Sequence, residues 1–431
     1  MITNSVLFES QFGFQKGKST IHSLIEIVEN IRNCMDNSMY GCGIFIDLKK
    51  AFDTVNHEIL IKKLEHYGVR GTSREWFSSY LNNRTQYTFC NNYSSDLKVI
   101  NCGVPQGSVL GPLLFLLYIN DLPNISKKLS FYLFADDTNI FYQSSDLNSL
   151  QKTINQELRK LSLWLNANRL ALNISKTNFV IFAAKNKPLK NVTILLNKKA
   201  IQQNDYVKYL GVLIDSRLTF KHHITSISLK LSRTTGAMRR IRNYVSDKTL
   251  LMIYHSLIYP HLLYGVSVWG NADAILLDTL HILQKKAVRI ISNNDKYIQT
   301  LFELPGQPIT YWLVDSYEKV HSSPLFSNLN ILKIFDIFKA SILTFVFDSL
   351  KKTNPIQFHD IFRYPANTLN TAANRRGNLD TPHVRTVTYG LKSVKYTGCV
   401  LWNELPSDIR DAQSKISFNK LVKKHYINMY T

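Results

Sequence analysis

The sequence predicts an α+β protein whose N-terminal half combines strands with helices and whose C-terminal half is mainly helical. Two acidic signatures lead to this prediction. Each follows a run of strand-forming residues, one ending at Asp47 and the other at Asp136 and Asp137. A third observation is the change near residue 221, after which apolar residues recur at helical spacing. With 45% hydrophobic residues in 431, the chain has room for two or three domains.

The N-terminal elements follow from periodicity and from residues that cap or break helices. A helix is predicted over 19–35, capped by Ser19 or Thr20, and a second helix ends at Gly68. Pro112 suits the first position of an apolar, buried helix, and Asp146 suits the cap of a long amphipathic helix. Strands are predicted over 42–48, 129–134, 138–142, 178–182 and 207–214, with a further hairpin over 85–99.

The C-terminal half is basic. Residues 221–300 contain 11 Lys and Arg against 4 Asp and Glu. One predicted helix buries an apolar face and carries basic residues elsewhere, namely Lys230, Arg233, Arg239, Arg240 and Arg242. These five residues are candidates for binding nucleic acid, the alternative being a solvated charged face. Further helices are predicted over 331–347 and 411–428.

Charge and cysteine usage limit the function classes. The net charge of +21 indicates a polyanionic partner, with nucleic acid ahead of an anionic membrane. The five cysteines are odd in number and lack zinc-ligand spacing, which favours a reduced intracellular compartment over a disulfide framework. The most apolar run, 109–119, is shorter than the ~20 residues that cross a bilayer, so no membrane association is expected.

The acidic signatures indicate a chemistry. A carboxylate at the end of the apolar strand before Asp47 is costly to bury unless it is paired or bound to metal. Asp136 and Asp137 lie at a predicted hairpin tip, and on their own they would fit an ordinary acidic turn. Two such strand ends brought together would hold two divalent cations and support nucleotidyl transfer to a 3′-hydroxyl. A glycine-bounded loop, residues 103–108, lies between them.

These motifs, in this order, resemble the palm of reverse transcriptases from non-LTR (LINE-type, jockey/CR1-like) retrotransposons. The matching segments are 11–20, 44–55, 101–122, 134–137, 172–177 and 209–215, with tail segments at 259–265 and 401–406. The resemblance implies a right-hand polymerase, in which an antiparallel palm sheet with packed helices is joined to partial fingers. It also implies domains over 1–215 (partial fingers and palm), 216–300 (helical thumb-like region) and 301–431 (C-terminal extension).

The resemblance also implies roles for individual residues. Asp47, Asp136 and Asp137 would be catalytic and would bind two Mg²⁺ ions, with Mn²⁺ as a possible substitute. Lys176 would lie near the leaving pyrophosphate. Nucleotide contacts are implied for Phe52, Gln106 and Gly107, with the Phe52 ring excluding a 2′-hydroxyl. Primer contacts are implied for Tyr209, Leu210 and Gly211.

The activity implied is RNA-directed DNA synthesis from deoxynucleoside triphosphates on an RNA template, extending a nicked DNA 3′ end in the nucleus. No protein partner is indicated. Gln15 stands where the family commonly has Arg, and Phe134 where it commonly has Tyr. The family's upstream fingers segment is missing, so an N-terminally truncated protein is expected. The alternatives are an inactive remnant that only binds nucleic acid, and another polymerase class such as an intron-encoded maturase or a viral RNA polymerase.

Overall fold

A computed structural model describes residues 6–292, 322–365 and 377–430. The chain forms two compact units. Unit 1 comprises residues 1–218 together with two short later segments, 355–357 and 384–390. Unit 2 comprises 219–354, 358–383 and 391–431. The predicted boundary at residue 300 lies outside the described residues.

Unit 1 is built on a five-stranded sheet in the order β11-β8-β1-β7-β6. The central strand β1 (Tyr40–Ile46) pairs antiparallel with both β7 (Asp137–Ser144) and β8 (Asn178–Phe182). Strand β6 (Ser130–Phe134) joins β7 through a tight turn, and the short β11 (Gln202–Gln203) runs parallel to β8. The strands predicted over 42–48, 129–134, 138–142 and 178–182 and the hairpin at the acidic pair are therefore confirmed, with strand ends shifted by up to two residues. The single strand predicted over 207–214 was wrong, because a turn divides this segment into two short strands.

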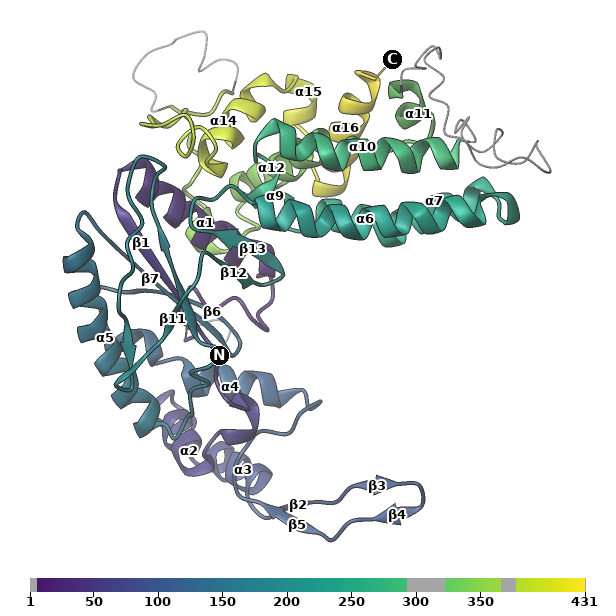
Figure 1. Ribbon diagram of the computed structural model, residues 1–431. Helices are drawn as coiled ribbons and strands as arrows, with labels where there is room; N and C mark the ends of the chain where they lie inside the picture. The colour runs from purple at the N-terminus through teal and green to yellow at the C-terminus, as the bar shows by residue number, and fades with distance from the viewer. Residues whose placement is uncertain (1–5, 293–321, 366–376, 431) are drawn as a thin grey trace, which may run out of the picture. The chain divides into compact units, whose positions relative to one another are not determined.

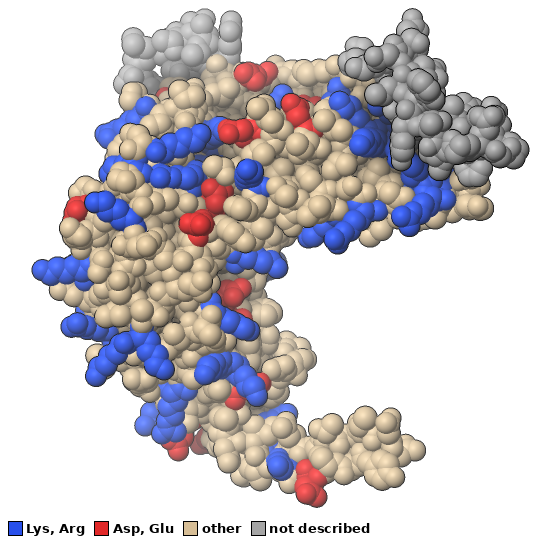
Figure 2. All heavy atoms as spheres, viewed as in Figure 1, with Lys and Arg blue, Asp and Glu red and all other residues tan. Residues whose placement is uncertain are grey.

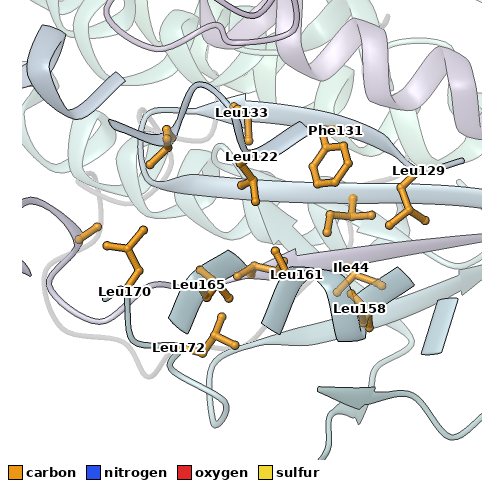
Figure 3. Packing of buried hydrophobic residues seen from close by; sticks show 14 of the residues in the cluster. Ile44, Leu122, Leu129, Phe131, Leu133, Leu158, Leu161, Leu165, Leu170 and Leu172 are labelled. Carbon is orange, nitrogen blue, oxygen red and sulfur yellow. The ribbon is translucent and has the colours of Figure 1, made fainter. Parts of the chain in front are cut away.

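Helices cover both faces of this sheet (Figure 1). On one face, Leu158 and Leu161 of α5 (Leu147–Ala167) join Ile44 and Phe131 in the main core (Figure 3). On the other face, Asn30 of α1 (Thr20–Asp36) donates to the Tyr132 hydroxyl. The strands alternate between the two faces, as buried antiparallel strands do.

Local capping explains where these helices begin. The side chain of Ser19 accepts from the His22 amide at the start of α1, and Asp146 accepts from the Ser149 amide at 2.7 Å at the start of α5. The apolar helix α4 begins at Leu110 and ends at Ile119, so Pro112 is its third residue, not its first. Proline is tolerated there because the first-turn amides have no partner within the helix.

The remaining elements of unit 1 are shorter. Helices α2 (His57–His66) and α3 (Thr72–Leu81) lead into a hairpin made of β2 (Arg84–Gln86), β3 (Phe89–Cys90), β4 (Tyr93–Ser94) and β5 (Lys98–Ile100). Two more strand pairs are formed by β9 (Leu195–Leu196) with β10 (Lys199–Ala200), and β12 (Tyr206–Tyr209) with β13 (Val212–Asp215). The short helices are η2 (Ala51–Thr54) and η3 (Leu122–Ile125).

Unit 2 is helical in its described part. Helix α6 (Lys221–Ile241) packs along α10 (Ala274–Ile291), and α12 (Ile334–Leu350) packs on α14 (Val394–Glu404) and α16 (Lys415–Asn428). The shorter elements are η4 (Arg242–Tyr244), α7 (Asp247–Ile253), η5 (Tyr254–Ile258), α8 (Tyr259–Leu263), α9 (Val266–Trp269), α11 (Ser323–Asn328) and α15 (Ser407–Arg410). A further short helix, η7 (Ile356–Phe358), spans the point where the chain passes from unit 1 to unit 2.

A buried glutamine ties the two halves of unit 2 together. Gln284 of α10 donates to the Leu332 carbonyl at 2.8 Å and accepts from the Ile334 amide at 3.0 Å. Helices from both sides of residue 300 therefore share one core, and a separate thumb-like region over 216–300 stays a prediction. All five cysteines are free thiols. No helix within the described ranges is both long and apolar enough to span a bilayer.

Candidate active site

Strand register brings the two acidic signatures together. Ile46 of β1 lies opposite Thr138 of β7, so the next residues in each direction, Asp47 and Asp137, come together at the same end of the sheet. Asp137 is also paired with Phe134 across the β6–β7 turn, in which Ala135 adopts the left-handed conformation at a φ of 55°. Asp136 is exposed in that turn. Two segments far apart in sequence thus present carboxylates at the same end of neighbouring strands.

Asp47 is held by the segment that contains Lys176. The Asp47 amide donates to Thr177 Oγ1 at 3.2 Å, and the Asp47 carbonyl accepts from the Asn173 amide at 2.8 Å. Thr177 is buried, and its hydroxyl donates in turn to the Asn173 carbonyl at 3.0 Å. Lys176 is exposed in the same turn. The predicted fourth motif therefore lies directly beside the first aspartate.

The acidic cluster changes the ionisation of one member. Desolvation by the surrounding chain, together with the smaller effect of the charges of Asp136 and Asp47, raises the pKa of Asp137 to about 6. The carboxyl is nevertheless on the exposed surface, so solvent screens part of this effect. Three carboxylates that repel one another form a site whose energy a cation would lower.

The chemistry of these donors fits a hard divalent cation, because Mg²⁺ prefers carboxylate oxygens. As placed, however, no three His, Cys, Asp or Glu side chains among the described residues form a group that could hold a metal ion.

The glycine-bounded loop lies against the segment that follows Asp47. The Val104 amide donates to the Phe52 carbonyl at 2.9 Å, and Gln106 Nε2 donates to Asp53 Oδ1 at 2.8 Å. Gly107 has a φ of 80° with open space around its Cα, so its backbone is accessible. Phe52, Gln106 and Gly107 are thus brought together, although the Gln106 amide group is already engaged by a carboxylate.

Phe52 is half-buried and supported from below. Its ring stacks on the ring of the buried Phe115, with centroids 4.3 Å apart. It also meets the ring of Phe14 edge-on, with centroids 6.4 Å apart. Phe14 follows Gly13, which lies directly against Ala135 in the acidic turn. This chain of contacts connects the Phe52 ring to the turn that carries Asp136.

Tyr209 differs from the other two residues predicted to contact the primer. Its side chain is 3% exposed, and its hydroxyl lies 2.5 Å from Ser23 Oγ on α1. Burial raises the pKa of this hydroxyl above its usual value. Leu210 and Gly211 form the turn between β12 and β13, with φ angles of 41° and 85°. Tyr209 anchors this hairpin, whereas Leu210 and Gly211 are at its tip.

In unit 2, α6 presents most of the basic residues that the sequence singled out. Lys230, Arg233, Arg239 and Arg240 are exposed, and Lys and Arg side chains lie along α6 in Figure 2. Arg242 is an exception, because the helix ends at Ile241 and the following turn buries its side chain. Its guanidinium pairs with Asp247 at 2.6 Å. The placement of Arg242 on the exposed basic surface was therefore wrong.

Some residues that shape the site were not singled out from the sequence. Thr177 accepts a hydrogen bond from Asp47, and Asp53 accepts one from Gln106. Gln11 accepts one from Ala135 in the acidic turn. Thr177 and Gln11 lie within motifs that carried the family resemblance, and this was the available signal. Their contacts are made across long sequence separations, so no local pattern could have assigned their roles.

Comparisons with known proteins agree with this geometry. Residues 1–214 match the family model described as "Reverse transcriptase (RNA-dependent DNA polymerase)". The chain is 30% identical over 315 residues to the "Probable RNA-directed DNA polymerase from transposon BS" of Drosophila melanogaster, covering 69% of this chain and 34% of that protein. It is 31% identical over 306 residues to the "RNA-directed DNA polymerase from mobile element jockey" of the same species, covering 67% and 32%. The chain thus spans about a third of the length of these relatives.

Among solved structures, telomerase from Candida albicans in complex with a telomeric RNA fragment matches 67% of this chain and 55% of its own chain. The identity is 11% and the TM-score 0.40, so this likeness adds nothing to the assignment. The assignment rests on the family model, on the curated relatives and on the carboxylates that the β1–β7 register brings together. Residues 1–214 therefore belong to the reverse transcriptase family, and the chain is related to the RNA-directed DNA polymerases of non-LTR mobile elements.

Proposed function

We propose that this chain is an RNA-directed DNA polymerase that adds deoxynucleotides to a primer 3′-hydroxyl on an RNA template. The observation that carries this proposal is the pairing of Ile46 with Thr138, which places Asp47 beside the turn of Asp136 and Asp137. Nucleotidyl transfer needs carboxylates from separate segments at one point, because two cations must be held ~3.5–4 Å apart. A reverse transcriptase family domain that retains this arrangement is best explained as an enzyme.

In this proposal Asp47, Asp136 and Asp137 hold two Mg²⁺ ions, which when bound activate the primer hydroxyl and stabilise charge on the leaving pyrophosphate. The protein contributes position and charge. Lys176, in the turn that holds Asp47, is a cation available to the pyrophosphate, where it would neutralise charge or donate a proton. The exposed backbone at Gly107 and the amide of Gln106 would contact the incoming nucleotide.

Phe52 would press its ring against the sugar of that nucleotide and so reject a 2′-hydroxyl. Its stacking on Phe115 supports this role, because a ring held from below cannot move away from an added oxygen. Leu210 and Gly211 would position the primer end, with Tyr209 anchoring their hairpin.

The nucleic-acid partners are also proposals. Lys230, Arg233, Arg239 and Arg240 offer an exposed positive surface on α6 that suits a phosphate backbone. The relatives named above are polymerases of mobile elements, and by analogy this chain would extend a nicked DNA 3′ end on element RNA in the nucleus.

The test is incorporation of deoxythymidine triphosphate on poly(rA)/oligo(dT) with Mg²⁺, comparing the chain with its Asp136→Asn variant. We expect the variant to lose at least ~10³-fold in rate, because one carboxylate of the two-metal site is removed. Asp96→Asn, an exposed change in the β2–β5 hairpin, is the matched control and should retain the activity.

The second candidate function is nucleic-acid binding without catalysis, favoured by the exposed basic residues of α6. In that case neither protein incorporates nucleotide, yet both bind the duplex with affinity that falls as salt rises. Absence of both incorporation and duplex binding would contradict both functions.

A further inference from the structure

The acidic turn is held by a segment from the start of the described chain. Residues 10–12 extend along the free edge of β6, where the Phe12 amide donates to the Leu133 carbonyl at 2.7 Å and the Leu133 amide donates to the Ser10 carbonyl at 2.8 Å. Gln11 and Leu133 form a parallel bridge. This segment, the edge strap (residues 10–13), therefore ends directly beside the turn that contains Asp136.

The contact between the edge strap and the turn is very close at Gly13. A Cβ built on Gly13 would lie 2.4 Å from the Ala135 nitrogen, a distance that real Cβ atoms do not reach. A residue with a side chain would therefore push the strap away from the turn. Glycine is needed here because of this close approach.

Gln11 supplies the polar contact. Its side chain is 2% exposed, and its Oε1 accepts from the Ala135 amide at 3.1 Å and from the Gly13 amide at 3.0 Å. Ala135 is itself buried and has a φ of 55°, which costs ~1–2 kcal/mol for a residue with a Cβ. A buried amide without an acceptor would cost ~1–3 kcal/mol more, so this single oxygen stabilises an unfavourable turn.

The backbone of Gln11 is braced in its turn. Its carbonyl accepts from Gln15 Nε2 at 2.6 Å and from Lys18 Nζ at 3.0 Å. Gln15 thus faces the strap, although it occupies the position that commonly carries an arginine in this family. Both the backbone and the side chain of Gln11 are therefore held, the carbonyl by the side chains of Gln15 and Lys18 and the side-chain oxygen by two backbone amides.

We propose that Gln11 is a positioning residue for the acidic turn: its side-chain oxygen fixes the Ala135 amide and so sets the direction in which the next residue, Asp136, presents its carboxylate. The catalytic role of Asp136 rests on the proposed polymerase function, whereas the control of the turn by Gln11 does not. A misplacement of about 1 Å at a reacting group can cost ~10²-fold in rate, so the hydrogen bond at Ala135 matters for catalysis.

The test compares Gln11→Met with Phe12→Leu in the full chain. Methionine keeps the approximate volume of Gln11 but removes the acceptor, whereas Phe12→Leu loosens the same strap and leaves the acceptor in place. Hydrogen–deuterium exchange reports the Ala135 amide, thermal unfolding reports overall stability, and steady-state kinetics separates kcat from KM for deoxythymidine triphosphate.

For Gln11→Met we expect Ala135 to exchange at least ~10-fold faster and kcat to fall ~10- to 100-fold, with KM changed less than ~3-fold. Phe12→Leu should lower the melting temperature yet keep Ala135 protection and kcat. Unchanged exchange at Ala135 in Gln11→Met, or an equal loss of kcat in Phe12→Leu, would overturn the proposal.

A third variant covers the case in which Gln11→Met does not fold. Gln11→Glu retains an acceptor oxygen and replaces Nε2, for which the described residues offer no partner, with a second oxygen. Ala135 should stay protected in this variant, and a loss of protection would overturn the proposal. If the wild-type chain shows no polymerase activity, the exchange measurements still decide whether Gln11 holds the turn, so the two failures are distinguishable.

Discussion

At the scale of single residues, the acidic cluster links charge to stability. The pKa of Asp137 is raised to about 6, first by desolvation and then by Asp136 and Asp47, so the folded chain holds its proton more tightly than the unfolded chain. The resulting stabilisation is present below the unfolded pKa of ~3.9 and is lost as the pH rises through about 6. The ionised cluster therefore works against folding at neutral pH when no cation is bound.

This reasoning gives a prediction for Asp137→Asn in the presence of a chelator. The melting temperature of the variant should exceed that of the wild type by ~2–4 °C near pH 8, and the difference should vanish near pH 4. Differential scanning calorimetry at both pH values is the measurement, with Asp96→Asn as a carboxylate control outside the cluster. A variant less stable than the wild type at pH 8 would contradict the electrostatic argument.

Phe52 supports a second prediction at this scale. Its ring rests on Phe115 and meets the edge of Phe14, so replacing it with alanine opens the space that the proposed function assigns to the nucleotide sugar. For Phe52→Ala, we expect the ratio of ribonucleotide to deoxynucleotide incorporation to rise at least ~10-fold, with ~1 kcal/mol of stability lost from the aromatic contact. Phe14→Ala is the matched control, since it removes the neighbouring ring and leaves the Phe52 ring in place. An unchanged ratio in Phe52→Ala would contradict the proposal that Phe52 rejects a 2′-hydroxyl.

The residue scale also shows what sequence could predict. Asp47 and Asp136 could be identified from sequence as candidate site residues because each follows an apolar strand. This local pattern places each carboxylate where a strand ends. Arg242 was misplaced because helical periodicity was extended one residue beyond the end of α6, where the chain turns and pairs it with Asp247. The direction of the next side chain depends on the residue at which the helix ends, and helix ends are harder to predict from sequence than the helices themselves.

At the scale of elements, the side chain of Tyr209 anchors the hairpin β12–β13. The hydroxyl of Tyr209 lies 2.5 Å from Ser23 Oγ on α1, and its ring lies 5.9 Å from that of Phe45. This contact joins the hairpin to the helix across 186 residues of sequence. The family resemblance implied that Tyr209 contacts the primer, and alternation along β12 directs its side chain inward.

A double-mutant cycle tests this anchor. Tyr209→Phe and Ser23→Ala should each lower the free energy of unfolding by ~1 kcal/mol, and the double variant should lose less than the sum, because both changes remove the same buried hydrogen bond. Urea denaturation provides the values. Strict additivity of the two effects would show that the hydroxyls do not interact.

Elements with a strong local signal were predictable, and the shortest ones were not. Helix α5 combines a capping aspartate with apolar residues at steps of three and four, so both its start and its buried face follow from sequence. Strands β9, β10 and β11 have two residues each, which is too short for any alternation to be read. Their pairing comes from the packing of the rest of unit 1.

At the scale of the whole molecule, the units do not follow chain order. Unit 1 includes residues 355–357 and 384–390, which come after more than a hundred residues of unit 2. Asp36, the last residue of α1, accepts from the Thr386 amide at 2.7 Å, from the Thr386 hydroxyl at 2.7 Å and from the Arg385 amide at 3.1 Å. A boundary drawn from sequence motifs could not anticipate this, because no local pattern marks Asp36 as the acceptor for a distant loop.

The returning segment leads to a prediction about the full chain. Asp36→Ala and Thr386→Ala should each destabilise unit 1 by ~1–3 kcal/mol, because each leaves buried or half-buried polar groups without a partner. Trypsin should then cleave after the exposed Arg385 faster than in the wild type, since a segment released from its contacts reaches the protease more often.

Cleavage at Arg84 and Lys98 in the β2–β5 hairpin is the internal control, because those sites make no contact with Asp36 and should keep their rates. Equal cleavage after Arg385 in the wild type and both variants would mean that Asp36 does not hold the segment. Faster cleavage confined to that site would show that residues 384–390 are part of the reverse transcriptase unit, so that its stability depends on chain far beyond residue 214.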